Sequence, residues 1–542
     1  MSPILAAMGA APPGSAPVPG RDYRPVLAFL IAAAILSVAV FAAHLDGEYV
    51  WDDIYLVQRN PVVQLPGQLR RLVTSDLWGS AQGEPTQLYH PIPMLTLRAE
   101  TLLGASLPAH RAVNIAIHLA CGFLLFLLLR KDLGWAFPAS GAVALFLLHP
   151  SVTEPVMWLT GRHDTLGVAA AIAAMLAWSS ASLARALGAA FLAAAAVLCK
   201  EPYVVVPGLL LVLELRRMRE AEQRPRLAQT GRVVLPFVAV AAIFGLRRVL
   251  GISAASDQLQ ASLGAHLGNF GSIVWHYLCQ LANFSNGPTV QTWRPLAPVA
   301  GITVVASAAV TVLAMGVTWW RGNRTAGGVL FGLVWFLLAL APHVLSLPLI
   351  GTWGNRYAYF PLAGLLYAGA FAVAGIANRV PRRVRILAVA ATGLAVCSLA
   401  PLTSSEAGCW RNEVTLFGTN AALYPADGKA LFHWGVAVTN ARGCGEAVAI
   451  FERAALYDPA EGRAWHNLAG CLLELRRFAE AVQPAERAFA LQPRDVGSEY
   501  NLGAALLLSG RTPEGITHLR SCRRRNPAYE PARKLLLSIG QD

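Results

Sequence analysis

Long apolar segments recur up to about residue 400 and are separated by short stretches that carry most of the charge. An α-helix needs about 20 mostly apolar residues to cross the hydrocarbon core of a bilayer. The segments that meet or approach this length lie near 24–43, 111–129, 135–150, 164–182, 184–199, 201–215, 232–250, 297–318, 327–346, 357–375 and 385–402. The pattern predicts about eleven helical spans within residues 24–402, preceded by an N-terminal tail over residues 1–23.

One further apolar stretch, 268–284, is interrupted by His276 and followed closely by Asn283 and Asn286. We interpret it as a re-entrant or interfacial segment, because counting it as a span disrupts the charge pattern of the loops. The C-terminal part, 403–542, lacks long apolar segments and is predicted to be a separate water-soluble domain.

Basic residues in short loops indicate which side of the membrane is cytoplasmic. They gather before the first span, after the second, before the seventh, after the eighth and before the last, at Arg21, Arg24, Arg130, Lys131, Arg216, Arg217, Arg219, Arg224, Arg226, Arg232, Arg321, Arg324, Arg379, Arg382, Arg383 and Arg385. With an odd number of spans all of them lie on one side. The 44–110 loop and the 403–542 domain then face the other side, which in a bacterial inner membrane is the periplasm. A twelfth span would move the C-terminal domain into the cytoplasm.

The composition agrees with a membrane protein, since 55% of the residues are hydrophobic and only 14% are charged, against about 25% charged in soluble domains. The net charge of +13 comes from loop and C-terminal arginines without an aromatic-interleaved basic patch, so we expect no nucleic-acid partner. The eight cysteines form no CxxC pair and indicate no zinc site. Whether Cys409, Cys444, Cys471 and Cys522 form disulfides is open.

The C-terminal domain repeats with a period of 34 residues, which is typical of tetratricopeptide repeats. The repeated positions are Pro425, Pro459, Pro493 and Pro527; Gly435, Ala469 and Gly503; Ala447, Ala481 and Gly515; Phe451, Ala485 and Leu519; and Ala454, Ala488 and Cys522. We expect three full repeats after a half-repeat at 411–425, closed by a helix near 528–538. Such solenoids commonly offer a groove to a peptide, although an unrelated helical bundle is the alternative.

Two adjacent acids, Asp52 and Asp53, follow the first span in YVWDDIYLVQRNPVV. A single aspartate there would serve as a helix N-cap. A second acid is not needed for capping, so the pair is a candidate for chemistry.

A second polar cluster lies in HPSVTEPVMWLTGRHD, at His149, Glu154, Arg162, His163 and Asp164. Ionisable residues near the membrane core are costly and therefore candidates for function, although an ordinary polar loop with its own ion pairs is equally consistent with this sequence.

Two further cationic positions accompany these acids. Lys200 precedes Glu201 between two apolar stretches, where the two could form a salt bridge with each other, and Arg356 begins a late span, where it could merely extend to the interface. A carboxylate can take a proton from an incoming hydroxyl, and cations can neutralise a departing phosphate. Together the four motifs favour group transfer from a lipid phosphate.

Three polar residues, His110, Asn114 and His118, share one helical face at i, i+4 and i+8. Metal ligation would suit this spacing, but we expect hydrogen bonding within the core.

The ordered motifs WDDIYLVQRNPVV, YHPIPMLTLRAE, HRAVNIAIHL, HPSVTEPVMWLTGRHD, CKEPYVVVP, NRYAYFPLAG and WRNEVTLF, followed by repeats, resemble the transmembrane and tetratricopeptide-repeat O-mannosyltransferases of the GT-C glycosyltransferase superfamily. The resemblance implies an all-α protein, with a GT-C-type helical membrane domain followed by a repeat solenoid. It also implies transfer of a mannose-like sugar from a polyprenyl-phosphate carrier to a protein Ser or Thr hydroxyl or to a glycan hydroxyl.

By this resemblance Asp52 is the catalytic base and Asp53 its acidic neighbour. The residues expected to contact substrate are His90, Glu154, Arg162, His163, Lys200, Glu201 and Arg356. The chain departs from the family at His90-Pro91-Ile92, where Arg-Pro-Leu is usual, and at Asn355-Arg356-Tyr357, where Glu-Arg-Tyr is usual. In sequence, Arg356 therefore has no acid beside it.

The expected reaction is a single inverting displacement that needs no metal, since the acid pair could hold Mg or Mn but no third ligand is evident. Two other functions remain open. A polysaccharide polymerase or ligase would usually carry its long external loop late in the chain, and a non-catalytic repeat scaffold would not need so many spans.

Overall fold

The computed structural model describes residues 23–78, 88–134, 136–220, 231–252, 263–282, 292, 295–350, 353–377 and 379–541. The predicted N-terminal tail lies almost wholly outside these residues, as do Arg21, Arg224, Arg226, Asn283 and Asn286. Within the described part every regular element is helical, as the sequence predicts. The chain forms two compact units, and the second consists of Asn412–Asp542 together with short earlier segments that include Thr292 and Trp353.

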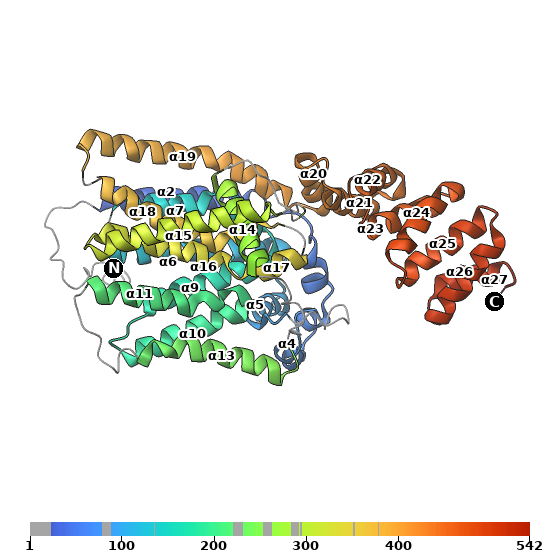
Figure 1. Ribbon diagram of the computed structural model, residues 1–542, viewed down its shortest axis with the longest axis horizontal. Helices are drawn as coiled ribbons and strands as arrows, with labels where there is room; N and C mark the ends of the chain where they lie inside the picture. Colours follow the sequence, from blue (N-terminus) through green and yellow to red (C-terminus); the bar gives the residue numbers. More distant parts are fainter. Residues whose placement is uncertain are drawn as a thin grey trace. The chain divides into compact units, whose positions relative to one another are not determined.

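The first unit is a bundle of long apolar helices that lie alongside one another (Figure 1). Six are long and apolar enough to cross a membrane in the described part of the chain, within Arg24–Ala42, Leu107–Leu133, Pro298–Trp320, Arg324–Leu347, Asn355–Ala377 and Arg382–Cys409. Phe137–Leu148 and Leu183–Cys199 are shorter apolar helices. The protein is therefore a multi-pass membrane protein, and the total of about eleven spans stays a prediction.

The helices follow the predicted apolar segments closely. They are α2 (Arg24–Ala42), α6 (Leu107–Leu133), α7 (Phe137–Leu148), α9 (Arg162–Ala177), α10 (Leu183–Cys199), α11 (Val206–Glu220), α13 (Val234–Val249), α15 (Pro298–Trp320), α16 (Arg324–Leu340), α17 (His343–Ile350), α18 (Tyr359–Ala377) and α19 (Arg382–Cys409). Helix α19 continues past the predicted domain boundary at residue 402.

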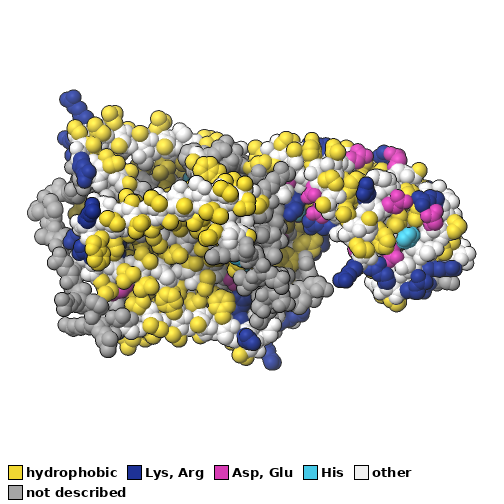
Figure 2. All heavy atoms as spheres, viewed as in Figure 1, with side chains coloured by type: hydrophobic (Ala, Val, Ile, Leu, Met, Phe, Trp, Pro, Cys, Tyr) yellow, Lys and Arg dark blue, Asp and Glu magenta, His cyan; other side chains and the backbone are white. Residues whose placement is uncertain are grey.

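Burial separates inner from outer helices of this bundle. Half of the apolar window of α6 is buried, but only 6% of that of α15. Because α15 exposes apolar residues such as Val310 and Leu313, this side of the bundle suits contact with lipid. Figure 2 shows hydrophobic side chains covering the face of the first unit in view.

The stretch predicted to be re-entrant or interfacial forms a helix, α14 (Leu263–Ala282), which packs closely on α15. A Cβ added at Gly271 would lie 1.9 Å from the carbonyl oxygen of Gly301, so only glycine allows this approach. Its last turns reach the residues before α18, where Tyr277 donates a hydrogen bond to the Gly354 carbonyl over 2.9 Å.

The described part of the loop after α2 folds into short helices, η1 (Ile54–Gln58), α3 (Pro61–Gln64), α4 (Leu69–Thr74) and α5 (Pro91–Leu102). They surround an apolar cluster that includes Leu56, Val63 and Leu97 and extends to Leu159. The loop is thus packed onto the turn that carries the second polar motif, and this contact positions the candidate site.

The second unit has the predicted repeat. First helices begin at Gly428 (α21), Gly462 (α23) and Val496 (α25), and second helices at Cys444 (α22), Phe478 (α24) and Thr512 (α26), all in steps of 34 residues. Helix α20 (Glu413–Leu423) precedes them and α27 (Glu530–Ser538) closes the array. The small-residue positions act as predicted, since a Cβ at Gly435 would lie 2.6 Å from the Phe451 ring. Cys444 and Cys471 form a disulfide that joins α22 to α23.

Candidate active site

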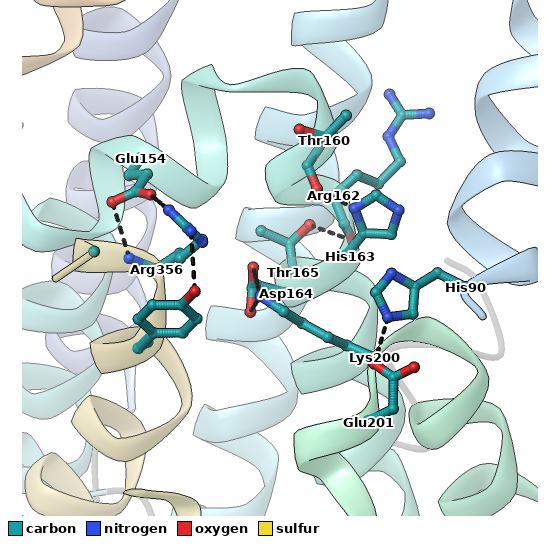
Figure 3. A network of polar contacts seen from close by, with 12 residues as sticks. His90, Glu154, Thr160, Arg162, His163, Asp164, Thr165, Lys200, Glu201 and Arg356 are labelled. Atoms are coloured by element: carbon teal, nitrogen blue, oxygen red, sulfur yellow. Dashed lines mark hydrogen bonds and ion pairs between the residues drawn. The ribbon is translucent and has the colours of Figure 1, made fainter. Parts of the chain in front are cut away.

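The predicted site residues meet at the end of the first unit where four short connections lie together. These are the loop after α2, the turns η2, α8 and η3 (Pro150–Gly161), the turn η4 (Glu201–Val205) and the turn η6 (Asn355–Ala358). Figure 3 shows their charged side chains as a set of paired acids and bases. The site is therefore built from segments far apart in sequence.

The two adjacent acids have different surroundings. Asp53 is buried, and its carboxylate accepts hydrogen bonds from the backbone N–H groups of Leu159 (3.3 Å) and Thr160 (3.0 Å). It occupies the N-cap position of η1 but makes no capping hydrogen bond. Asp53 therefore does not act as a helix cap, which was the alternative role for the pair. Asp53 instead fastens the first loop to η3.

Asp52 is half-buried, and no residue in the described part of the chain donates a hydrogen bond to it. Burial raises the pKa of Asp52 from 3.8 to about 6, and the nearby Arg356 charge opposes this rise. Burial also raises the pKa of Asp53, to about 7, against the effect of its two N–H donors. Asp52 is therefore the acid of the pair whose oxygens are available to a substrate proton.

Arg356, which has no acid beside it in sequence, has one in space. Its Nη1 forms an ion pair with Glu154, its backbone N–H donates to the same carboxylate over 3.1 Å, and its Nη2 donates to the Tyr357 hydroxyl over 3.0 Å. Its guanidinium also lies 5.1 Å from the ring centre of Trp158. Glu154 thus supplies the acid that Asn355 does not.

Arg162 is fully buried and uses its N–H groups within the protein. They donate to Asn114 (2.7 Å), Thr96 (3.2 Å), both oxygens of Glu100 (2.5 and 3.1 Å) and the His110 carbonyl (2.9 Å). No donor is left for a phosphate. The geometry therefore favours a positioning role for Arg162, which joins α5, α6 and α9, over the substrate contact expected from sequence.

The helical face of His110, Asn114 and His118 serves hydrogen bonding, as expected. His110 contacts Glu100 over 2.6 Å, and Asn114 donates to the Trp158 carbonyl over 3.1 Å. His118 contacts the Tyr359 hydroxyl over 2.7 Å.

Lys200 and Glu201 do not pair with each other. Lys200 Nζ donates to both oxygens of Asp164, each over 2.8 Å. Glu201 contacts His90 Nε2 over 2.5 Å and Arg247 over 3.2 Å. Lys200 has extended backbone (φ −168°, ψ 139°), and successive side chains point to opposite sides of an extended chain.

The cations differ in what they can still bind. Arg356 keeps its Nε hydrogen and one hydrogen on each Nη, and Lys200 keeps one ammonium hydrogen beyond those given to Asp164. Arg162 keeps none. Arg356 and Lys200 are therefore the cations that fit an anionic ligand.

Several residues that lie near the site were not predicted from the sequence. Trp51, Trp158 and Trp410 stack, with ring centres 5.5 and 6.0 Å apart. His343 lies against Tyr357, with ring centres 4.5 Å apart. Trp51, Trp158 and Trp410 lie within motifs that carry the family resemblance. Their position in those motifs was the sequence signal that could have identified them as neighbours of the site.

Arg111, which holds the segment that precedes Asp52, was also not predicted from the sequence. It is fully buried and donates to the carbonyl oxygens of His44, Leu45, Asp46, Glu48 and Trp410, over 2.7 to 3.3 Å. Gly47 lies inside this clamp, where a Cβ would come within 2.5 Å of the Arg411 carbonyl oxygen.

The described residues contain no group of three His, Cys, Asp or Glu side chains placed to hold a metal. Asp53 already accepts two backbone hydrogens, one on each carboxylate oxygen.

These features define a multi-pass membrane protein with a buried, charge-paired site beside one unengaged acid. No protein-family model matches the chain. It is similar to the protein O-mannosyl-transferase Tmtc1 of Drosophila melanogaster (30% identity over 182 residues, 32% of this chain and 21% of that protein). It is also similar to human TMTC1 (30% over 209 residues, 34% and 23%) and human TMTC4 (28% over 226 residues, 36% and 30%). The similarity thus spans less than a third of each relative.

Likeness to solved structures is weak. MamA from Desulfovibrio magneticus RS-1 matches at 22% identity with a TM-score of 0.20, covering 21% of this chain and 64% of that chain. The anaphase-promoting-complex assembly Cut9–Hcn1 matches at 13% identity with a TM-score of 0.22, covering 82% and 92%. Neither likeness carries an argument about fold or function.

Proposed function

We propose that the protein is a membrane glycosyltransferase that moves a mannose-like sugar from a polyprenyl-phosphate carrier to a Ser, Thr or glycan hydroxyl. The observation that carries this proposal is the contrast between the two acids. Asp52 has no hydrogen-bond donor among the described residues and lies near the Arg356 charge, whereas Asp53 is occupied by the backbone of η3. The similarity to protein O-mannosyl-transferases over about a third of the chain supports the same reaction.

In this mechanism the acceptor hydroxyl gives its proton to Asp52 and attacks the anomeric carbon. The bond from that carbon to the phosphate oxygen breaks, and the phosphate leaves with its electron pair. Arg356 and Lys200 neutralise the growing charge with their remaining N–H groups. Glu154 and Asp164 orient these cations, and Asp53 and Arg162 hold the segments that carry them.

We further propose that the site and the repeats face the periplasm of a bacterial inner membrane, where the repeat groove would dock the acceptor protein or glycan. The disulfide between Cys444 and Cys471 supports an oxidising compartment for the second unit. The odd number of predicted spans supports the same side.

Replacing both Cys444 and Cys471 by Ser is expected to lower the free energy of unfolding of the repeats by about 3 kcal/mol, because the disulfide closes a loop between residues 27 apart in sequence. Thermal unfolding with and without reductant measures the loss. Peptide mapping of non-reduced protein from intact membranes should recover the linked peptides. Two free thiols there would contradict the periplasmic placement, and Cys409→Ser, which lies outside the disulfide, is the control.

The transfer rate should depend on pH through Asp52. Burial raises the pKa of this carboxyl to about 6, and a general base works only when ionised. On its acidic side the pH profile of kcat/KM should therefore rise with pH, with its half-point near pH 6. Below that point it should fall about tenfold per unit. An acidic limb near pH 4 would show that the base is an ordinary exposed carboxylate instead.

The function is tested by comparing periplasmic glycoproteins of a strain lacking this protein with those of its parent by mass spectrometry. Loss of hexose from Ser or Thr peptides, restored by the wild-type chain, supports the transferase. An unchanged set of glycans contradicts it.

A further inference from the structure

Two histidines at one side of the site each keep a buried ring nitrogen that has no hydrogen-bond partner among the described residues. The imidazole rings of His90 and His163 have their centres 5.0 Å apart and are tilted relative to each other, and Figure 3 shows them next to each other. Both residues are at most 6% exposed, yet His90 Nδ1 and His163 Nε2 have no partner in the described part of the chain. Leaving a buried polar atom unpaired costs free energy, so these atoms mark a place that a ligand can complete.

The proton positions follow from the partners. His163 Nδ1 faces the Thr160 carbonyl oxygen, which can only accept, so Nδ1 carries the hydrogen and the ring is neutral. His90 Nε2 faces Glu201 Oε2 and donates to it. The other oxygen of Glu201 forms an ion pair with Arg247 (3.2 Å) and accepts a hydrogen bond from the Tyr89 backbone N–H (3.2 Å).

Glu201 contacts the Nε2 side of the ring, so a hydrogen on His90 Nδ1 points away from Glu201. The neighbouring cations, Lys200 and Arg247, are each paired with an acid, and neutral His163 adds no charge. His90 is therefore placed to give a proton to a ligand.

The two proposed phosphate contacts are joined through Tyr357, and His90 and Lys200 both lie near His163. Lys200, which precedes Glu201, lies 5.1 Å from the ring centre of Tyr357. The hydroxyl of that ring accepts from Arg356 over 3.0 Å. In the view of Figure 3, Lys200 lies between Arg356 and His90.

We propose that His90, supported by Glu201, donates its Nδ1 proton to the phosphate oxygen that leaves the sugar. This inference rests on the proposed function. The bond from the anomeric carbon to that oxygen breaks, its electron pair goes to the oxygen, and the oxygen takes the proton from His90. The acceptor oxygen forms the new bond and gives its own proton to Asp52. Neutral His90 and protonated Asp52 then exchange protons with water.

The role of His90 predicts that this residue contributes more to binding of the product than to binding of the donor. In the donor, a phosphodiester, the reacting oxygen is bonded to carbon and carries little charge. In the product, a phosphomonoester, the same oxygen is no longer bonded to carbon and shares the transferred proton with His90 in a strong hydrogen bond. Arg356 and Lys200 contact the other oxygens, which are present in both.

The test compares binding of farnesyl phosphate, a monoester, with methyl farnesyl phosphate, a diester, to the purified full chain in nanodiscs by calorimetry. His90→Gln should weaken monoester binding about tenfold and diester binding no more than about twofold. Glu201→Gln, which keeps the shape of its side chain, should act in the same direction. Arg356→Gln should weaken both ligands, and His518→Gln in the second unit should weaken neither.

The results separate this inference from the function on which it rests. If the wild type binds neither lipid, the polyprenyl-phosphate reaction and the role of His90 both fail. If it binds them and His90→Gln affects both equally or neither, the proton-donor role fails and the reaction stands. Melting temperatures of all variants show that each is folded, and Glu201→Gln decides the question if His90→Gln does not fold.

Discussion

Replacing Asp52 by Asn is expected to lower kcat by about 10²- to 10⁴-fold while leaving folding and lipid binding intact. The amide cannot take the acceptor proton, but it has nearly the shape of the carboxylate. Because no described residue donates a hydrogen bond to Asp52, the change leaves no orphaned donor. A carboxyl whose pKa burial has raised destabilises the fold when ionised. The variant should therefore be at least as stable as the wild type at pH 7.

The matched variants are Asp53→Asn and Asp46→Asn. Asp53 accepts two backbone N–H groups, and an amide can replace only one of its oxygens as acceptor, so the free energy of unfolding should fall by about 1–3 kcal/mol. Asp46 is exposed, and its replacement should change neither kcat nor the free energy of unfolding. Rates come from transfer of labelled sugar and stability from thermal unfolding. Full activity of Asp52→Asn would show that another group is the base.

The repeat unit could be predicted in detail because its determinants are local. A period of 34 residues fixes which helices pair, and small residues such as Gly435 and Gly503 mark where the paired helices approach. The starts of α21, α23 and α25 keep that period. The apolar helices of the first unit could be predicted for a related reason, since the length of an apolar segment is a property of the segment alone.

The ion pairs and hydrogen bonds between the site residues could not be predicted in the same way. The sequence shows that Glu154, Arg162 and Arg356 are ionisable residues in an apolar chain, but it does not show which of them meet. Glu154 pairs with a residue 202 positions later, and Arg162 with one 62 positions earlier. These contacts depend on the packing of α5, α8, α9 and η6, which no local pattern encodes. Arg162 was expected to bind substrate for this reason, although its donors are all used.

The same limit applies to the two acids. A doublet such as Asp52–Asp53 indicates chemistry, but the sequence does not show that the two acids have different roles. That difference follows from the turn η3, whose two N–H groups reach Asp53 only. The tryptophan stack joins residues from three distant segments, at 51, 158 and 410. In the sequence these residues are isolated aromatic positions, and nothing there indicates that they stack on one another.

Replacing Arg356 by Gln is expected to weaken binding of farnesyl phosphate at least tenfold, whereas Glu154→Gln should strengthen it. Glu154 is the acid that neutralises Arg356 in the free protein, and it competes with a phosphate for the same guanidinium. Without it, Arg356 is a buried cation that lacks its carboxylate, and the free energy of unfolding should fall by about 3–5 kcal/mol. Bound phosphate should restore part of that loss, because it supplies the missing negative charge.

The double variant Glu154→Gln with Arg356→Gln separates the structural role of the pair from its binding role. It removes both charges, so its stability should exceed that of either single variant, and its affinity should stay as low as that of Arg356→Gln alone. Arg162→Gln is the matched control, since it also breaks a buried ion pair but removes no donor that is open to a ligand. It should lose stability and keep its affinity for farnesyl phosphate. Loss of affinity in Arg162→Gln but not in Arg356→Gln would reverse the assignment and place the phosphate beside α5 and α6.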